Sequence, residues 1–167
     1  MDQVVIRPAT DVDHPRIVDL LSRSWGSTTV VAHGVKYDAS TLPALLAVRR
    51  GRLAGLLTYT IGGDAFEVVS IDAVVERAGV GTALLEAAVE RAEAAGLARL
   101  WLVTTNDNLD ALRFYQRRGM RLVQINRGAV DESRKLKPRI PLTGEFGIEI
   151  HDEIMLEMRL PRRESHH

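Results

Sequence analysis

The chain has 167 residues, of which 22 are basic, 22 are acidic and none is cysteine. A chain of this length forms one domain with a core that needs no metal or disulfide. The lack of cysteine excludes a disulfide scaffold, a thiolate zinc site and a cysteine nucleophile. The formal net charge of zero argues against a general binder of nucleic acid or of anionic membranes. The chain opens without a signal-peptide pattern, and its apolar runs fall short of the ~20 residues of a membrane span, so we expect a cytoplasmic protein.

The first part of the chain predicts a strand, a helix and a second short strand. Residues 4–6 are apolar and β-branched, which favours a strand. Thr10 suits a helix N-cap, and the helix is expected to end near residue 25. Its predicted inward stripe, at helical spacing, consists of Val12, Ile17, Leu20 and Leu21. The β-branched segment 28–35 predicts a short strand.

The middle of the chain predicts three consecutive antiparallel strands. The apolar runs 45–48 and 53–60 flank the polar turn 49–52, which is typical of a hairpin. A glycine-rich turn then leads into a third strand at 66–73. Together these strands predict a meander.

Helical periodicity begins at residue 79. The helix is expected over 79–95, with Gly96 as its C-terminal stop and with an inward face of Leu84, Leu85, Ala88 and Ala92. The continuous apolar run 100–104 predicts a strand buried on both faces. A strand, a helix and a strand in succession imply a parallel crossover at the centre of the sheet.

The last part predicts a helix and two strands around a polar segment. Asn108 suits the cap of a helix over 109–118, and 121–125 reads as a strand. Residues 128–149 are loop-like, with room for one short helix, and 153–160 alternate as a closing strand does.

We therefore expect a mixed α/β (α+β) fold built as one domain over residues 1–160. It contains a single mixed sheet, with an antiparallel N-terminal meander, a central parallel strand pair and helices on both faces. Residues 128–149 form an insertion before the last strand, and residues 161–167 form a flexible polar tail.

A glycine-containing turn over 74–82 joins the third strand of the meander to the following helix. Gly79 and Gly81 allow a tight turn whose backbone amides, with the helix N-terminus, suit phosphate oxygens. Arg77 adds a basic group, and a plain tight turn is the alternative. No lysine follows Gly81, which excludes a Walker loop. The turn follows a meander and lacks a third glycine, which excludes a Rossmann fingerprint.

Two segments match known motifs in the same order and in a matching strand–helix framework. The first is Glu76-Arg77-Ala78-Gly79-Val80-Gly81, and the second runs from Asn108 through Ala111, Phe114 and Tyr115 to Gly119-Met120. In these segments the chain resembles the GNAT superfamily of N-acetyltransferases, whose motifs are Arg/Gln-x-x-Gly-x-Gly/Ala and Asn-x-x-Ala-x-x-Phe-Tyr-x-x-x-Gly-Phe. Glu76 and Met120 depart from the motifs, and the resemblance covers about residues 4–125.

The resemblance implies an acetyl-CoA-dependent N-acetyltransferase without a metal cofactor. Such an enzyme transfers an acetyl group to a primary amine of a small molecule or peptide, by direct attack of the amine on the thioester. The first motif holds the CoA pyrophosphate, the preceding strand contacts the pantetheine arm, and the asparagine of the second motif touches CoA. The implied CoA-binding residues are Ile71, Ala73, Arg77, Ala78, Gly79, Val80, Gly81, Thr82, Asn108 and Tyr115.

The chemistry needs an acid for the leaving thiolate and a base for the amine proton. Tyr115 matches the tyrosine near the CoA sulfur in relatives, so we expect it to be the acid; simple packing of the helix is the alternative. Glu67 is the first candidate base, because some relatives carry a base glutamate early in this strand. Asp72 and a water chain are the alternatives. Strict alternation places Glu67 and Asp72 on opposite faces unless a bulge intervenes.

We expect three aromatic or imidazole side chains, together with the insertion, to form the part of the site that binds the acceptor amine. Trp25, His33 and Tyr37 lie where relatives build the acceptor wall, and residues 128–149 are expected to cover the pocket. His33 is a weaker candidate base, because a loop histidine is more often solvated. His151 and its neighbours offer no third ligand, so we expect no metal site there.

A CoA-binding domain without turnover, used as a sensor or interaction partner, is the alternative function. The departure at Glu76 favours it, and Tyr115 argues for catalysis. Relatives often pair subunits through edge strands near the C-terminus, which suggests a homodimer.

Overall fold

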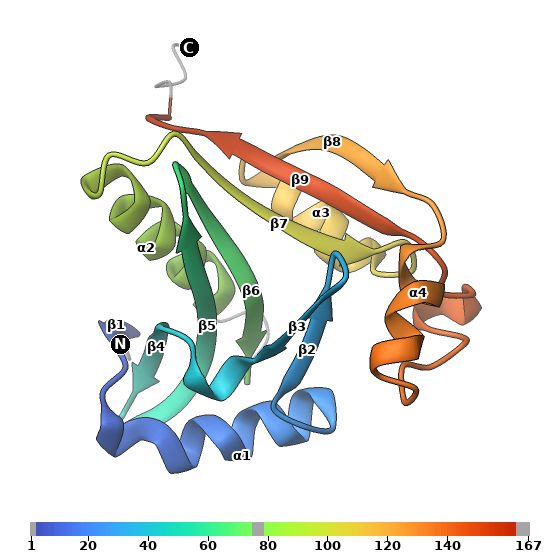
Figure 1. The fold of residues 1–167 in the computed structure, drawn as a ribbon. Coiled ribbons are helices and arrows are strands. Elements are labelled where there is room, and N and C mark those ends of the chain that lie inside the picture. Colours follow the sequence, from blue (N-terminus) through green and yellow to red (C-terminus); the bar gives the residue numbers. More distant parts are fainter. Residues whose placement is uncertain (1–2, 75–78, 163–167) are drawn as a thin grey trace.

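A computed structural model of the chain describes residues 3–74 and 79–162, and these residues form two sheets with helices on both sides (Figure 1). The larger sheet has seven strands, and all its neighbouring pairs but one are antiparallel. In spatial order they are β1 (Val5–Pro8), β4 (Ala44–Arg49), β5 (Arg52–Gly62), β6 (Ala65–Ala73), β7 (Arg99–Thr105), β9 (Glu153–Arg159) and β8 (Arg121–Asn126). The predicted meander is β4–β5–β6, and the predicted parallel pair is β6–β7.

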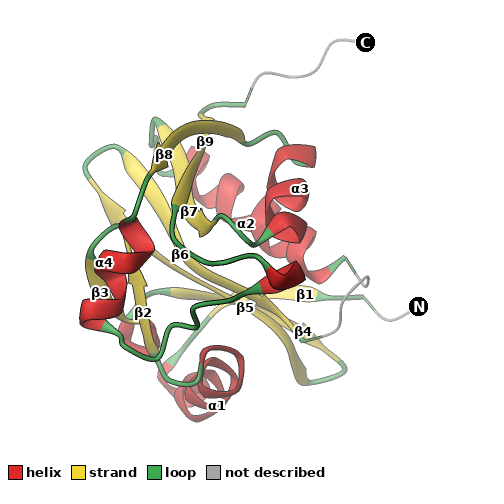
Figure 2. Ribbon diagram, turned by 90° about the vertical axis from the view of Figure 1, so that its right-hand side faces the viewer, coloured by secondary structure: helices red, strands yellow, loops and turns green. Residues whose placement is uncertain are grey.

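The helices pack on opposite faces of the large sheet (Figure 2). Helix α1 (His14–Trp25) covers one face, and α2 (Val80–Ala94) and α3 (Leu109–Arg117) cover the other. Because strand side chains alternate, Leu46 and Leu56 pack toward α1 while Leu45 and Leu57 pack toward α2. A fourth helix, α4 (Ala129–Leu136), stands beside the sheet. Within the described part of the chain, every helix is too short or too polar to cross a membrane.

The segment predicted as one short strand forms a hairpin and a second sheet. Strands β2 (Thr29–Ala32) and β3 (Val35–Asp38) pair with each other, and both residues between them have positive φ, His33 at 42° and Gly34 at 79°. Val30 of this hairpin packs against the α1 core. The hairpin therefore lies on the same face of the large sheet as α1.

The prediction of a buried stripe on α1 was wrong at one residue. Ile17, Leu20 and Leu21 are buried, whereas Val12 is 88% exposed. The α-helix begins only at His14, after a short 3₁₀ turn that carries Val12 away from the stripe. On α2 the four predicted inward residues are all buried.

Strand β6 contains a β-bulge that decides which way its acidic residues point. Its pairing with β5 shifts between Thr58↔Ser70 and Tyr59↔Val68, which leaves Val69 as the extra residue. A bulge resets the alternation of side chains. Glu67 and Asp72 therefore lie on the same face, where Glu67 contacts the β2–β3 hairpin and Asp72 contacts the end of α1.

Candidate active site

The two parallel strands separate soon after they meet, and the gap between them is a cavity. Strands β6 and β7 pair at Ala65↔Arg99, Phe66↔Leu100 and Glu67↔Trp101 and then diverge. The cavity has a volume of about 680 Å³ and lies between residues 68–73 of β6 and 102–104 of β7. Backbone groups of β6 that face β7 have no strand partner along this stretch, so they are available to an extended ligand.

Helix α3 contributes one end of the cavity wall. Asn108 caps this helix, because its Oδ1 accepts from the Ala111 backbone N–H at 3.3 Å, and both residues line the cavity. The cap predicted from the sequence is therefore present, and Asn108 keeps a place at the cavity edge.

Tyr115 lines the same cavity from the next turn of α3 and is only 7% exposed. Among the described residues its hydroxyl has no hydrogen-bond partner, which leaves the proton free for a ligand. Burial, and secondarily the negative charge of Asp72, raise the pKa of the Tyr115 hydroxyl. The phenol is therefore protonated at neutral pH, as a proton donor must be.

The glycine turn leads into the N-terminus of α2. Gly79 is the residue before the helix and has φ 74°, a conformation that favours glycine. At Gly81 a Cβ atom would lie 3.2 Å from Phe114 Cζ of α3, so this glycine also allows the two helices to pack closely. The backbone N–H groups of Val80, Gly81 and Thr82 belong to the first helical turn, which has no internal acceptors for them. These amides have no partner within the helix, and their binding of a phosphate stays a prediction.

The structure describes only some of the residues of this turn that were predicted to bind CoA. Arg77 and Ala78 lie outside the described residues, as does Glu76 and the part of the predicted tail at 163–167. The Thr82 hydroxyl accepts from Arg118 Nε at 2.9 Å, and Arg118 also lies over the Phe114 ring. The Thr82 side chain therefore ties α2 to α3, and its backbone amide is the group that remains for a phosphate.

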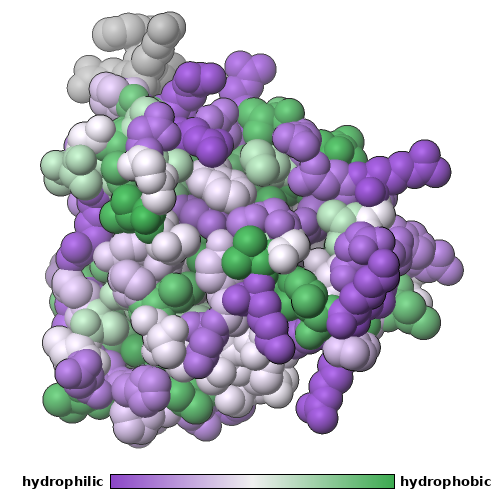
Figure 3. All heavy atoms as spheres, viewed as in Figure 1, coloured by the Kyte–Doolittle hydropathy of each residue, from purple (hydrophilic) through white to green (hydrophobic). Residues whose placement is uncertain are grey.

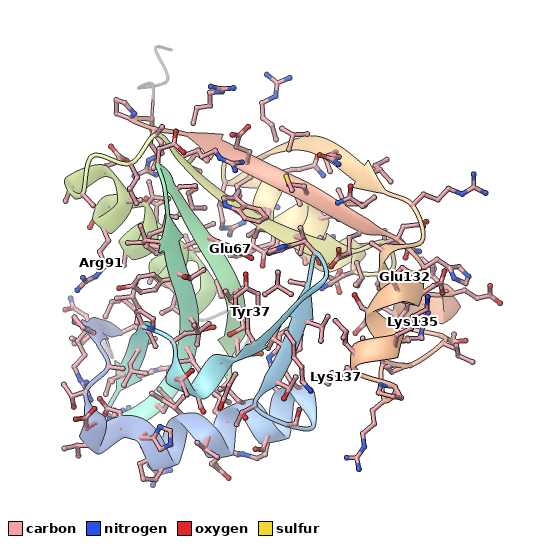
Figure 4. The ribbon with its side chains drawn as sticks, viewed as in Figure 1. Tyr37, Glu67, Arg91, Glu132, Lys135 and Lys137 are labelled. Atoms are coloured by element: carbon pink, nitrogen blue, oxygen red, sulfur yellow. The ribbon has the colours of Figure 1, made fainter. Side chains whose placement is uncertain are left out.

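On the α1 face, Glu67 lies where β6 and β7 begin to separate, and it is enclosed by the hairpin. It is 5% exposed, its Oε1 accepts from the Tyr37 hydroxyl at 2.9 Å, and its Oε2 lies 2.7 Å from His33 Nε2. Figure 4 shows Tyr37 and Glu67 next to each other beside β6. The structure brings together three residues that the sequence analysis assigned to the site separately.

His33 is held at both its backbone and its ring. Its backbone N–H donates to the two carboxylate oxygens of Glu153 on β9, at 3.1 and 3.2 Å. Its ring packs on Trp101 with centroids 5.0 Å apart. The hydrogen bond with Glu67 is the main cause that raises the pKa of His33; burial opposes it, and the charges of Glu67 and Glu153 add to the rise. Burial in turn raises the pKa of Glu153.

Sequence reasoning missed Glu153 and Trp101 as site residues. Trp101 lies directly opposite Glu67 in the parallel pair, and Glu153 lies opposite Thr105 in the β7–β9 pair. Both positions follow from strand neighbours that are distant along the chain. No local pattern in the sequence indicates them.

Asp72, the alternative base, lines the cavity itself. Its Oδ2 accepts from Trp25 Nε1 at 2.9 Å, and burial raises its pKa while hydrogen bonds from Trp25 and Ser24 act the other way. Ile71 and Ala73, the predicted pantetheine contacts, line the cavity beside it. The bulge thus places both candidate bases on the α1 side of the gap.

The insertion folds back onto this side of the site. Glu145 lines the cavity, and its backbone N–H donates to Asp107 Oδ2 at 2.9 Å. Lys137 Nζ donates to the Thr29 carbonyl at 2.7 Å, which joins the segment after α4 to the hairpin (Figure 4). The outer surface on this side carries hydrophilic side chains interspersed with small hydrophobic groups (Figure 3). The insertion therefore contributes one residue, Glu145, to the cavity wall, and its role as a cover of the pocket stays a prediction.

Comparison with known proteins identifies relatives along most of the chain. The model of the acetyltransferase (GNAT) family matches residues 15–120. The chain is 37% identical over 153 residues to the uncharacterized protein YdhI of Bacillus subtilis (strain 168). The aligned residues cover 91% of this chain and 96% of YdhI. It is 38% identical over 156 residues to the uncharacterized protein YxbD of the same organism. The aligned residues cover 93% of this chain and 98% of YxbD.

Solved acetyltransferase structures share the fold. An IAA acetyltransferase from Bacillus cereus ATCC 14579 superposes with a TM-score of 0.73 at 24% identity, over 95% of this chain and 100% of that chain. A GNAT family acetyltransferase from Elizabethkingia anophelis with acetyl-CoA bound superposes with a TM-score of 0.67 at 22% identity, over 96% of this chain and 100% of that chain. The family match spans the glycine turn and the Asn108–Met120 segment, which confirms the resemblance, and the chain belongs to the acetyltransferase (GNAT) family.

Proposed function

We propose that this protein is an acetyl-CoA-dependent N-acetyltransferase that acts on a primary amine of a small molecule or peptide. One observation carries the proposal: the wall of the cavity between the diverging strands includes Tyr115, a protonated phenol whose hydroxyl has no hydrogen-bond partner among the described residues. Structural relatives with CoA or acetyl-CoA bound support the choice of cofactor. Cytoplasmic location and a homodimer stay predictions from the sequence.

The features of the chain fit acetyl-CoA along its length. The first-turn amides of α2, after Gly79, suit the pyrophosphate. The unpaired backbone of β6 beside Ile71 and Ala73 suits the amide groups of a pantetheine arm, which would extend the sheet at the gap. Asn108 lies at the edge of the same cavity, at the start of α3. When bound, acetyl-CoA supplies an activated acyl thioester.

The residues of the chain would then serve two proton transfers. Tyr115 would hand its hydroxyl proton to the sulfur that leaves when the carbon–sulfur bond breaks. The proton lost by the attacking amine nitrogen would pass to the acidic side of the gap, where Glu67 and Asp72 lie. Tyr115 lies on the α2 side of the sheet and the two carboxylates lie on the α1 side, so the donor and the acceptor would approach a bound thioester from opposite sides.

The charge of the cavity wall favours a cationic acceptor. Asp72 and Glu145 line the cavity, and none of its described lining residues is lysine, arginine or histidine. Two carboxylates attract a protonated amine and repel an acceptor that carries its own carboxylate. We therefore place alkyl amines, and peptide amines without a nearby acidic group, ahead of free amino acids.

A CoA-binding domain without turnover remains the second candidate. It is favoured by one observation, the enclosure of Glu67, which is 5% exposed and has both carboxylate oxygens engaged by Tyr37 and His33. A base in this state is not directly open to an amine. The two candidates share the CoA site and differ in whether an amine accelerates thioester cleavage.

The first test is binding, measured as the shift in thermal unfolding with acetyl-CoA. At one hundred times Kd the ligand adds about 2.7 kcal/mol, a shift of several degrees for a domain of this size. Ala73→Glu places a carboxylate at the exposed end of the cavity wall, where it meets the ligand, and should remove the shift. Ala95→Glu, at the exposed C-terminus of α2, is the matched control and should keep it.

The second test is thiol release from acetyl-CoA on addition of amines. Release that rises with alkyl amines, and less with amino acids, supports the transferase. Binding without amine-dependent release supports the sensor alternative. No thermal shift in the folded wild-type protein refutes both, and an equal shift in Ala73→Glu refutes the assigned cavity.

A further inference from the structure

The enclosure of Glu67 raises the question of which group meets the acceptor amine. Glu67 has a side chain only 7% exposed, and Tyr37 and His33 cover its two carboxylate oxygens. An amine that approached Glu67 directly would have to displace one of these donors and leave it unpaired, which costs free energy. The His33 side chain is more open, at 22% exposed, and shares the Glu67 hydrogen bond.

The two ring partners of His33 lie just before the cavity along their strands. Its ring packs on Trp101, and Trp101 lies two residues before Val103, which lines the cavity. Glu67 lies two residues before Val69, another lining residue. Two residues of strand span about 7 Å, so the ring partners of His33 lie within about 7 Å, along their strands, of residues that line the cavity.

His33 is held in place by more contacts than a solvent-exposed loop histidine would make. The residue has φ 42°, in the left-handed region that non-glycine residues rarely adopt. Its backbone N–H is fixed by the buried carboxylate of Glu153, and its ring by Glu67 and Trp101. Three strands distant in sequence therefore hold one histidine at the tip of a hairpin, two of them through its ring and one through its backbone.

We propose that His33 is the base that takes the proton of the acceptor amine, and that Glu67 is the residue that positions it. This rests on the proposed acetyltransferase function. With Glu67 ionised, Nε2–H donates to Glu67, so the lone pair of the neutral ring lies on Nδ1. The proton leaves the amine nitrogen and reaches Nδ1 through bridging water. The imidazolium then passes it to solvent after the acetylated product leaves.

The surroundings of His33 favour this role electrostatically. The ionisable groups that face it are Glu67 on β6, Glu153 on β9 and the Tyr37 hydroxyl on β3, and its neighbour on β7 is the uncharged Trp101. Two carboxylates stabilise the imidazolium, and the pKa of His33 is raised accordingly. The neutral ring is the active form, so kcat/KM should rise with pH through that pKa and then level off.

The test begins with the protein alone, without any acceptor. The chain has five histidines, and ¹⁵N NMR of labelled protein, with His33→Gln to assign the signal, reports the pKa and tautomer of His33. We expect the Nε2–H tautomer and a pKa above the ordinary value of about 6.5. Glu67→Gln should lower this pKa. A neutral ring protonated on Nδ1, or a pKa unmoved by Glu67→Gln, overturns the proposal.

Kinetics with an amine found by the thiol-release screen complete the test. His33→Gln should lower kcat by roughly 100-fold and abolish the pH limb, with acetyl-CoA affinity unchanged. Glu67→Gln should shift the rise of kcat/KM with pH to lower pH, by the same amount as it lowers the pKa of His33 in the NMR titration. His14→Gln, at the exposed start of α1, is the control and should match wild type. Unchanged kcat and an unchanged limb in His33→Gln would assign the base to Glu67 or Asp72 and refute the proposal.

The outcome is separable from that of the proposed function. If acetyl-CoA binds and no amine accelerates thiol release, the transferase itself fails, and the base assignment falls with it whatever the NMR titration shows. If amines are acetylated and His33→Gln behaves as wild type, only the base assignment fails.

Discussion

Replacement of the Tyr115 hydroxyl separates its role in chemistry from its role in folding. Tyr115→Phe keeps the ring, which belongs to the core cluster that α3 shares with α2 and the sheet. Since the hydroxyl makes no hydrogen bond among the described residues, its loss should change the free energy of unfolding by less than about 0.5 kcal/mol. A positioned acid contributes about 10²–10⁴ to the rate, so kcat should fall at least roughly 100-fold, which equals about 2.7 kcal/mol of transition-state stabilisation.

The assay compares three quantities for each variant: kcat from thiol release, Kd for acetyl-CoA and the urea midpoint. Tyr59→Phe is the matched control, because Tyr59 stacks on Phe66 and does not line the cavity. It should leave kcat and Kd unchanged. A Tyr115→Phe variant with wild-type kcat would refute the assignment of Tyr115 as the acid. A loss of kcat accompanied by an equal loss of acetyl-CoA affinity would assign the hydroxyl to binding.

Two predictions concern stability. Gly55→Ala adds a Cβ 2.5 Å from Val80 Cγ1 and 2.8 Å from a backbone oxygen of β6, so it should destabilise the fold by about 2 kcal/mol, while Gly62→Ala, in open space on the same strand, should not; equal urea midpoints would contradict this. Asp13→Asn should cost about 1–2 kcal/mol at pH 7, because the buried carboxylate is bound by Arg7 and its pKa is lowered. The wild-type advantage is present above the unfolded pKa of about 3.9 and shrinks as pH falls below it; a constant difference between pH 7 and pH 2 would oppose the assignment.

Local patterns predict those parts of the fold whose burial follows chain periodicity. The strands of the meander and helix α2 have apolar spacing that identifies both the element and its inner face. The parallel pairing of β6 with β7 follows from the helix between them. Val12 was wrong because its spacing continues the stripe of α1 while the helix begins two residues after it.

The candidate site could be predicted where a motif marks it or where the order of strands places a residue beside the gap. Tyr115 and Asn108 were found because the family motif is contiguous, and both line the cavity. The bulge at Val69 was left open by the sequence, since a single extra residue in a strand has no compositional mark, and it decides the direction of Asp72. The roles of Tyr115 and Glu67 in catalysis stay predictions.

The position of β9 in the sheet determines which parts of the fold can form only at the end of synthesis. Strand β9 lies between β7 and β8, although both precede it in the chain. While residues 1–152 alone have left the ribosome, β7 lacks its outer neighbour and β8 has no partner in the sheet. Glu153, which holds His33, is the first residue of the missing strand. The contacts that fix His33 are therefore among the last parts of the molecule to be assembled, after helix α2 and the glycine residues at its start have already left the ribosome.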